Sequence, residues 1–368
     1  MVQLRIEVGI SVWYNILITA FSEKTGALRT LTAKMPRSPH GGQATYYMVW
    51  MCKNMNGIMS YALNVSTQVA ILFILIAVGA VLTKVKMLSE VGAKQITNLV
   101  LYFVTPAVII KAFAGGEVKC TPDNIKMLAV AAVSAVLAHA VAFAIGWLVF
   151  RRRDKRDSML ACAVLMSNCG FMSLPLAQAL LGDKGVFIVT VYVGVFNIVA
   201  WTVGLRIISG EKMSLKRAVL NPGVLSAVTG IIMFLCGVDL SPLTVVIEPI
   251  KHLAALNTPL PMIVIGYYLA QMRLKPEKGD GRIMLAISLR LVAAPLITMA
   301  ILRAVGVTGL ALSACVLPAC APAAVLVMMF AANCGGDAMG ASRTVSVSHA
   351  ASIITMPLML MLCKLIGG

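Results

Sequence analysis

The chain has 368 residues, of which 60% are hydrophobic and only 12% charged, and its mean hydropathy is +0.91. Soluble domains are about half apolar, so this composition excludes a soluble globular protein and predicts one that lies in the lipid bilayer. The formal charge of +17 does not indicate a nucleic-acid partner, because the Lys and Arg residues lie in the breaks between apolar segments rather than on one basic face with interleaved aromatic residues.

The first 58 residues differ from the rest of the chain. Their one apolar run, residues 8–21, is too short to cross a bilayer, and the polar stretch "EKTGALRTLTAKMPRSPHGGQ" follows it. The run has no small-residue cleavage site, which a secretory signal peptide would need. We expect residues 1–58 to be a poorly ordered extension, with the true start at a later methionine such as Met51, Met55 or Met59.

After about residue 65, apolar windows of about 17–25 residues recur with short polar breaks. We expect an all-α membrane protein with about ten transmembrane helices, at residues 66–83, 94–113, 126–150, 158–181, 186–208, 222–237, 250–272, 282–304, 309–333 and 344–365. One set of connecting segments then carries 17 Lys and Arg residues and the other carries 7. The positive-inside rule assigns the first set to the cytoplasm, so both termini of this multi-pass plasma-membrane protein are expected outside it.

The fourth and ninth predicted spans resemble each other, because each is a long apolar window with helix-breaking residues near its centre. They read "ACAVLMSNCGFMSLPL" and "SACVLPACAPAAVLV". The second and seventh spans also match, with "LVLYFVTPAVII" and "LAALNTPLPMIVIG". Five spans separate the members of each pair, and an odd number of crossings reverses the direction of the second copy. We therefore expect two inverted five-helix repeats, residues 59–208 and 209–368.

The two broken spans suggest a binding site. Proline removes a backbone hydrogen bond, and the freed N–H and C=O groups are tolerated only where protein or a water-filled cavity surrounds them. Two breaks at matched points of inverted halves would bring half-helix ends together near the bilayer midplane, where the positive N-terminal ends favour an anion. Either span alone could be an ordinary kinked helix, but the matched pair favours a substrate site.

The same segments resemble the auxin efflux carrier family of membrane transporters, which includes plant auxin carriers and bacterial malate or malonate permeases. The resemblance runs from about Met59 to Gly368 and is carried by "VTPAVII", "SNCGFMSLPLAQALLGDKG", "YVGVFNIVAWTVG", "NPGVLSAVTG", "TPLPMIVIGYYLA" and "APAAVLVMMFAANCGGD". It implies two inverted five-helix repeats that form a scaffold part and a transport part. The fourth and ninth helices would cross at their broken points, and the transport part would move like an elevator.

The resemblance also implies substrate-binding residues. Asn168, Gly170 and Pro175 would form one arm of the crossover, and Pro322 with its neighbours the other. The ninth span differs from some relatives in having no polar residue beside Pro322. Backbone groups freed by Pro318 and Pro322 could serve there instead.

Further polar side chains within the predicted spans are candidates for substrate binding or for helix packing. Arg290 could bind a substrate carboxylate through its bidentate fork, or it could lie near the end of its span and support a helix end. Asn257, beside a double-proline break, could bind substrate or another helix. His139 and His349 could relay protons, although packing through a hydrogen bond is the favoured interpretation. No carboxylate lies in the middle of a span, which disfavours ion coupling.

These features predict a secondary transporter that moves a small organic anion, a dicarboxylate such as malate or malonate, by alternating access. The alternatives are an auxin-like monocarboxylate efflux carrier and a non-transporting membrane receptor for such an anion. No hydrolase or ATP-binding motif and no metal-binding C-x-x-C pair is present, so we expect neither an enzyme nor a cofactor or metal. The expected partners are the anion and the lipid bilayer, with a homodimer left open.

Overall fold

The computed structural model describes residues 43–151, 154–210, 220–271 and 280–367. The chain divides into two units, residues 1–57 and 58–368, and the second unit contains all the features described below. Most of the expected N-terminal extension, residues 1–42, lies outside the described residues. Residues 43–57 form the first part of helix α3.

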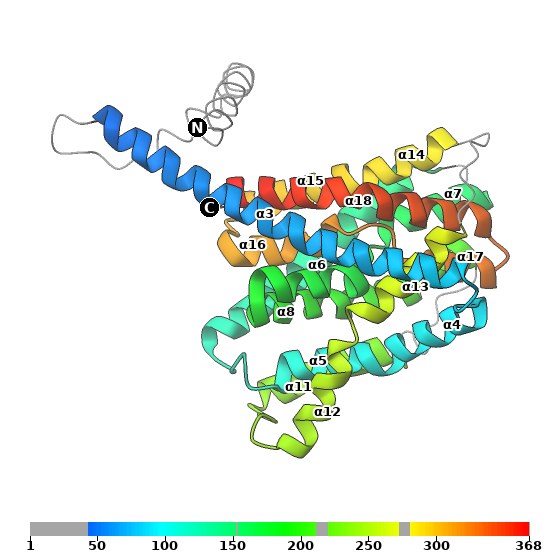
Figure 1. Ribbon diagram of the computed structural model, residues 1–368, viewed down its shortest axis with the longest axis horizontal. Coiled ribbons are helices and arrows are strands. Elements are labelled where there is room, and N and C mark those ends of the chain that lie inside the picture. Colours follow the sequence, from blue (N-terminus) through cyan, green and yellow to red (C-terminus); the bar gives the residue numbers. More distant parts are fainter. Residues whose placement is uncertain (1–42, 152–153, 211–219, 272–279, 368) are drawn as a thin grey trace. The chain divides into compact units, whose positions relative to one another are not determined.

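The described part of the chain is helical, apart from one isolated β-bridge (Figure 1). The elements are α3 (Gln43–Lys84), α4 (Glu90–Leu99), η1 (Val100–Val104), α5 (Thr105–Ala114), α6 (Pro122–Val149), α7 (Lys155–Leu165), η2 (Cys169–Ser173), α8 (Leu174–Val199), η3 (Ala200–Gly204), α9 (Leu205–Ser209), α11 (Pro222–Leu235), α12 (Thr244–Ala255), α13 (Pro259–Ala270), α14 (Asp280–Ser288), η4 (Leu289–Ala293), α15 (Ala294–Ala304), α16 (Gly309–Val316), η5 (Leu317–Cys320), α17 (Val325–Asn333) and α18 (Ala338–Gly367).

Several of these helices are long and apolar enough to cross a bilayer. Among the described residues there are seven such spans, Ser60–Lys84, Glu90–Ala114, Pro122–Val149, Cys169–Ser209, Thr244–Ala270, Gly281–Ala304 and Ala338–Gly367. Two shorter apolar helices cover Pro222–Leu235 and Gly309–Cys320. The span Cys169–Ser209 contains two helices joined at Gly182, whose φ is 65°. The expectation of an all-helical, multi-pass membrane protein is therefore confirmed, whereas the number of ten helices stays a prediction.

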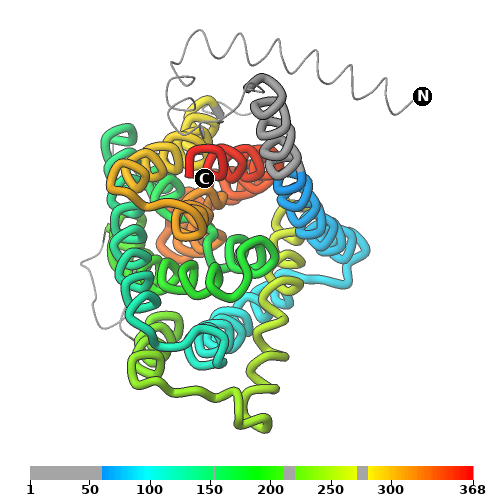
Figure 2. Tube along the Cα trace, turned by 90° about the vertical axis from the view of Figure 1, so that its left-hand side faces the viewer, coloured from blue at the N-terminus to red at the C-terminus, as the bar shows by residue number. Residues whose placement is uncertain are grey.

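The helices of the second unit pack in two groups. In one group, α5 packs against α11 and α12, and α4 packs against α13. In the other, α6 packs against α7, α8 and α15, while α18 packs against α14, α16 and α17. Figures 1 and 2 both show α5, α11 and α12 on one side of the unit and α14, α15 and α18 on the other. Contacts of α8 with α5 and α11 join the two groups.

Small residues let these helices approach closely. Helix α6 buries a stripe of Ala131, Ala135, Ala138 and Ala142 at helical spacing, which ends at Gly146. A side chain at Gly146 would meet the backbone of α7. Since lipid tails are as apolar as the helices, close packing of small residues is what holds membrane helices together. The alanine-rich stripe thus explains how one face of α6 packs closely in its group, whereas large apolar side chains elsewhere on the helix, such as Val133, Val136 and Trp147, are exposed.

Three prolines follow wide π-helical turns, of which η1 and η4 lie within continuous helices and η2 begins the half-helix that continues into α8. Pro106 follows η1, Pro175 follows η2 and Pro295 follows η4, each by two residues. A proline ring clashes with the carbonyl four residues earlier and leaves it without a donor, and a π turn absorbs both effects without ending the helix. Pro175 therefore lies at the start of α8 and does not itself interrupt the fourth predicted span.

Candidate substrate site

The fourth and ninth predicted spans are interrupted, and the two interruptions pair with each other. The first lies between α7 and η2, and the second between η5 and α17. The N–H of Asn168 donates to the carbonyl of Pro322 at 2.7 Å, and the N–H of Ala324 donates to the carbonyl of Met166 at 2.9 Å. An antiparallel bridge is formed between the two segments. Interruption of a helix frees backbone N–H and C=O groups, which need partners in the protein interior. Here the freed groups of each break bond to those of the other.

Arg290 holds both breaks in place from the turn η4. Its side chain is buried, with 2% exposure, and all three guanidinium nitrogens donate to backbone carbonyls. Nη1 lies 2.9 Å from the carbonyl of Val164, at the end of α7. Nε lies 3.1 Å from the carbonyl of Ala321, and Nη2 donates to the carbonyl of Ala319. The planar donor fork therefore satisfies carbonyls that helix interruption has freed on two different spans.

Helix α18 contacts both breaks through two adjacent residues. The hydroxyl of Ser348 accepts the N–H of Ala323 at 3.2 Å, and Nε2 of His349 lies 2.9 Å from the side-chain nitrogen of Asn168. His349 was among the residues predicted from the sequence, and Ser348 was not. The signal available was the polar cluster "SVSHAAS", which lies in the middle of an apolar helix and needs hydrogen-bond partners there.

A cavity of about 610 Å³ lies beside the paired breaks. Its wall includes the first turns of the two half-helices that follow the breaks, at Gly170 and Phe171 on one and at Val325 and Leu326 on the other. Neither half-helix start has a side-chain cap. No capping side chain therefore uses the first N–H groups of either half-helix. These N-terminal ends also carry the partial positive charge of the helix dipole.

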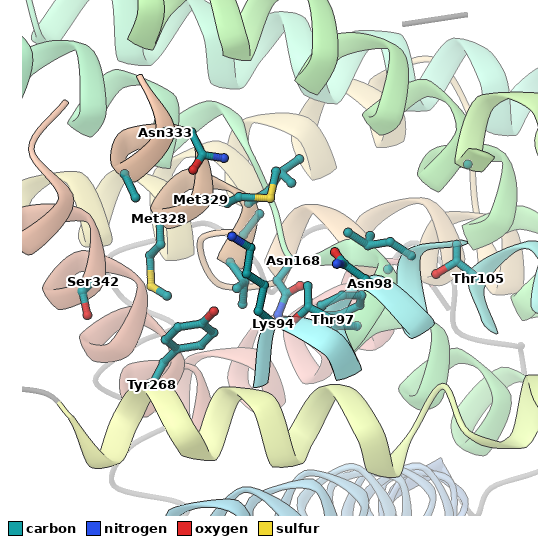
Figure 3. A pocket seen from close by; sticks show the side chains of 18 of the residues that line it. Lys94, Thr97, Asn98, Thr105, Asn168, Tyr268, Met328, Met329, Asn333 and Ser342 are labelled. Atoms are coloured by element: carbon teal, nitrogen blue, oxygen red, sulfur yellow. The ribbon is translucent and has the colours of Figure 1, made fainter. Parts of the chain in front are cut away.

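The remaining wall of the cavity is part polar and part aromatic. Lys94 and Tyr268 extend into the space near Asn168, with Asn98 and Thr97 close by (Figure 3). Further polar lining residues are Glu90, Thr105, Asn197, Asn221, Gln271, Asn333, Ser342 and Arg343. The aromatic lining residues are Tyr102, Phe171, Phe196, Trp201, Tyr267 and Tyr268. This cavity could hold an organic acid, with N–H donors and basic side chains for a carboxylate and aromatic faces for an apolar body.

A second, smaller cavity of about 250 Å³ is lined by Pro175, Asn257, Lys111 and Lys251, among others. One hydrogen bond links the walls of the two cavities, because Nδ2 of Asn257 donates to the carbonyl of Gly170 at 3.3 Å. The amide oxygen of Asn257 is buried and has no hydrogen-bond partner. Asn257 thus bonds to another helix, from the break between α12 and α13.

The structure distributes the seven predicted site residues over three places. Asn168 and Gly170 line the large cavity, and Pro175 and Asn257 line the small one. The three that are buried around the paired breaks and line neither of these cavities are Pro318, Pro322 and Arg290. For Arg290, these contacts agree with the helix-supporting interpretation, and a direct role in substrate binding stays a prediction.

Comparison with known proteins decides the family. A family model described as "Membrane transport protein" matches the chain twice, over residues 64–216 and 210–360. The chain belongs to this family. The predicted membership of the auxin efflux carrier family is thereby confirmed, and membership indicates a transporter rather than an enzyme. The transporter is also similar to the "Uncharacterized transporter MJ1031" of Methanocaldococcus jannaschii, with 25% identity over 217 residues that cover 56% of this chain and 70% of that protein.

Proposed function

We propose that this transporter is a secondary carrier that moves a small organic anion across the plasma membrane by alternating access. The observation that carries the proposal is the opening of two uncapped half-helix starts, at Gly170 and at Val325, into one cavity. Helix N-termini bind anions because their free N–H groups point at the ligand and the helix dipole favours negative charge. A carboxylate of the substrate would lie against these two starts and Asn168.

A dicarboxylate such as malate or malonate is the first candidate. Its second carboxylate would need a cation in the same cavity, and Lys94 extends into the cavity from α4 (Figure 3). Arg343 lines the same cavity from α18. A lysine ammonium is a strong partner for a carboxylate where water is partly excluded. The acidic side chain of Glu90 also lines the cavity, so the lining has two basic side chains, Lys94 and Arg343, and one acidic side chain.

An aromatic monocarboxylate of the auxin type is the second candidate, and a specific observation favours it. Phe171, Phe196 and Trp201 line the cavity together with Tyr267 and Tyr268. An indole ring would stack on such faces, whereas a short dicarboxylate would leave most of this apolar wall in contact with water. The two candidates therefore differ in whether Lys94 or the aromatic wall supplies the selectivity.

The arrangement of charges around the two cavities supports alternating access. With the predicted topology, Lys94 and Arg343 lie on the cytoplasmic side, and Lys111 and Lys251 on the outer side. The large cavity would then face the cytoplasm in an inward-open state, and the small cavity would mark the closed outer path. The two packing groups, joined through α8, would be the scaffold and transport parts of an elevator-type motion.

Counterflow in proteoliposomes tests the proposal. Vesicles preloaded with unlabelled malate should accumulate external radiolabelled malate, and the initial rate should saturate with concentration. Competition by malonate would identify the substrate as a dicarboxylate. Stronger competition by indole-3-acetate would identify it as an aromatic monocarboxylate. A linear flux would contradict a carrier and indicate a channel. Saturable binding to the purified protein without any exchange would indicate a receptor.

A further inference from the structure

His349 is fully buried in the middle of α18, and both of its ring nitrogens have hydrogen-bond partners. Nδ1 lies 2.8 Å from the carbonyl oxygen of Val345, one turn earlier in the helix. A carbonyl oxygen can only accept, so Nδ1 carries the ring proton. In the neutral ring Nε2 is then an acceptor, and the side-chain nitrogen of Asn168 donates to it across 2.9 Å.

This contact determines what Asn168 presents to the cavity that it lines. An amide has two N–H donors on one edge and an acceptor oxygen on the other. The neutral His349 ring uses one of the two N–H groups of Asn168 and makes no use of its oxygen. An ionised carboxylate only accepts hydrogen bonds, so it gains from the N–H groups of Asn168 and is repelled by Oδ1.

We propose that His349 is the proton site of this transporter, and that a proton on its Nε2 turns the Asn168 amide so that both N–H groups face the substrate carboxylate. The inference rests on the proposed function, since it assumes an anion in the cavity. The step transfers one proton from a hydronium ion of the solvent to Nε2: an O–H bond breaks, an N–H bond forms and water is released. The protonated ring donates to Val345 and to Oδ1 of Asn168. Anion and proton then bind in a one-to-one ratio.

The charges around His349 explain why the proton and the anion would bind together. Among the described residues of the elements that pack against α18, the one carboxylate is Asp157, and Arg282 pairs with it at 2.6 Å. The buried guanidinium of Arg290 adds positive charge to the same interior. Among the described residues of these elements, a proton on His349 therefore has no carboxylate to offset it, other than the already paired Asp157, until the anion enters the cavity.

The titratable and charged groups on α18 and on the elements packed against it are Lys155, Arg156, Asp157 and Cys162 on α7, Cys169 on η2, Tyr267 and Tyr268 on α13, Arg282 on α14, Arg290 on η4, Arg303 on α15, Cys315 on α16, Cys320 on η5, and Arg343, Cys363 and Lys364 on α18 itself. Helix α17 carries none, and the side chain of Asp280 at the start of α14 lies outside the described part of the chain.

Nuclear magnetic resonance of the ligand-free transporter tests the switch without assuming a substrate. In protein labelled with ¹⁵N in histidine and asparagine, Nε2 of His349 should carry no proton at high pH. As the pH falls and His349 gains its proton, the side-chain amide signals of Asn168 should shift with the same midpoint. Asn168→Ala assigns those signals, and His349→Gln should abolish the shift. Signals of Asn168 that do not follow the His349 titration would overturn the proposal.

Binding measurements in the same samples test the coupling. Linkage requires that a proton and an anion tighten each other's binding by the same factor. The wild type should take up one proton for each malate bound, and its Kd should rise by up to about tenfold per pH unit between about pH 6 and pH 8. His349→Gln, which cannot take the proton, should bind with a Kd that does not change over this range.

The matched control is His139→Gln. His139 is also a buried histidine with Nδ1 on a carbonyl one turn earlier, that of Ala135, but the structure gives it no bond to Asn168. The Kd of His139→Gln for malate should change with pH as steeply as that of the wild type. An equally steep change of Kd with pH in the wild type and in His349→Gln would contradict the coupling. An amide shift in a protein that binds neither malate nor indole-3-acetate would leave the switch standing and would count against the proposed substrates alone.

Discussion

Replacing Arg290 with alanine should lower the thermal stability of the purified transporter more than any other single substitution of a cation. The change leaves the carbonyls of Val164, Ala319 and Ala321 without the donors that Arg290 supplies. Each buried acceptor without a partner costs about 1–3 kcal/mol, so the loss should reach about 3 kcal/mol or more. The thermal stability of Arg290→Lys should lie between those of the alanine variant and the wild type, because an ammonium has no planar fork to span three carbonyls.

Arg303→Ala is the control for this prediction. Nε of Arg303 also donates to one backbone carbonyl, that of Ile366, but the contact is exposed and water can replace it. Its loss should change stability by less than about 0.5 kcal/mol. Unfolding temperatures of the three variants and the wild type, measured in one detergent, check the order. An Arg290→Ala protein as stable as Arg303→Ala would show that the crossover does not depend on this side chain.

Replacing Gly170 with leucine should weaken substrate binding while leaving the fold intact. A Cβ added at Gly170 meets no atom within 4 Å, because this residue faces the large cavity at the start of a half-helix. A leucine side chain would occupy the place that we assign to the substrate carboxylate. We expect KM for uptake to rise by about tenfold or more, equivalent to about 1.4 kcal/mol of lost binding, with the unfolding temperature unchanged.

Gly281→Leu serves as the matched control. A Cβ at Gly281 also meets no atom within 4 Å, but this residue is exposed on α14 and does not line the large cavity. Its kinetics should equal those of the wild type. Unchanged uptake by Gly170→Leu would place the substrate elsewhere in the protein.

The sequence was sufficient to predict that the fourth and ninth spans are interrupted, because both carry clusters of helix-breaking residues. In the fourth span the break falls at residues 166–168, just before Gly170. It also predicted that Asn168 and Gly170 belong to the site, and both line the large cavity. Pro175 was expected to share in the interruption, yet the π turn η2 accommodates it at the start of α8. A residue's effect on its own turn depends on how the preceding turn can widen, and composition does not encode that.

Contacts between distant segments could not be predicted from the sequence. Arg290 bonds to Val164, which is 126 residues away, and His349 bonds to Asn168, 181 residues away. Local patterns such as periodicity and breaker residues carry no information on which buried polar groups meet across the fold. For this reason the sequence left two roles open for Arg290, and it did not connect His349 with the break in the fourth span.

The most direct test of substrate binding at the paired breaks is uptake of radiolabelled malate into proteoliposomes by the wild type and by Asn168→Ala at equal incorporation. The alanine variant keeps the backbone bond from residue 168 to Pro322 and loses the side-chain amide, which borders the cavity and bonds to Nε2 of His349. The proposed site predicts saturable uptake by the wild type and at least about a tenfold loss of kcat/KM in the variant. Equal uptake by both proteins would contradict it.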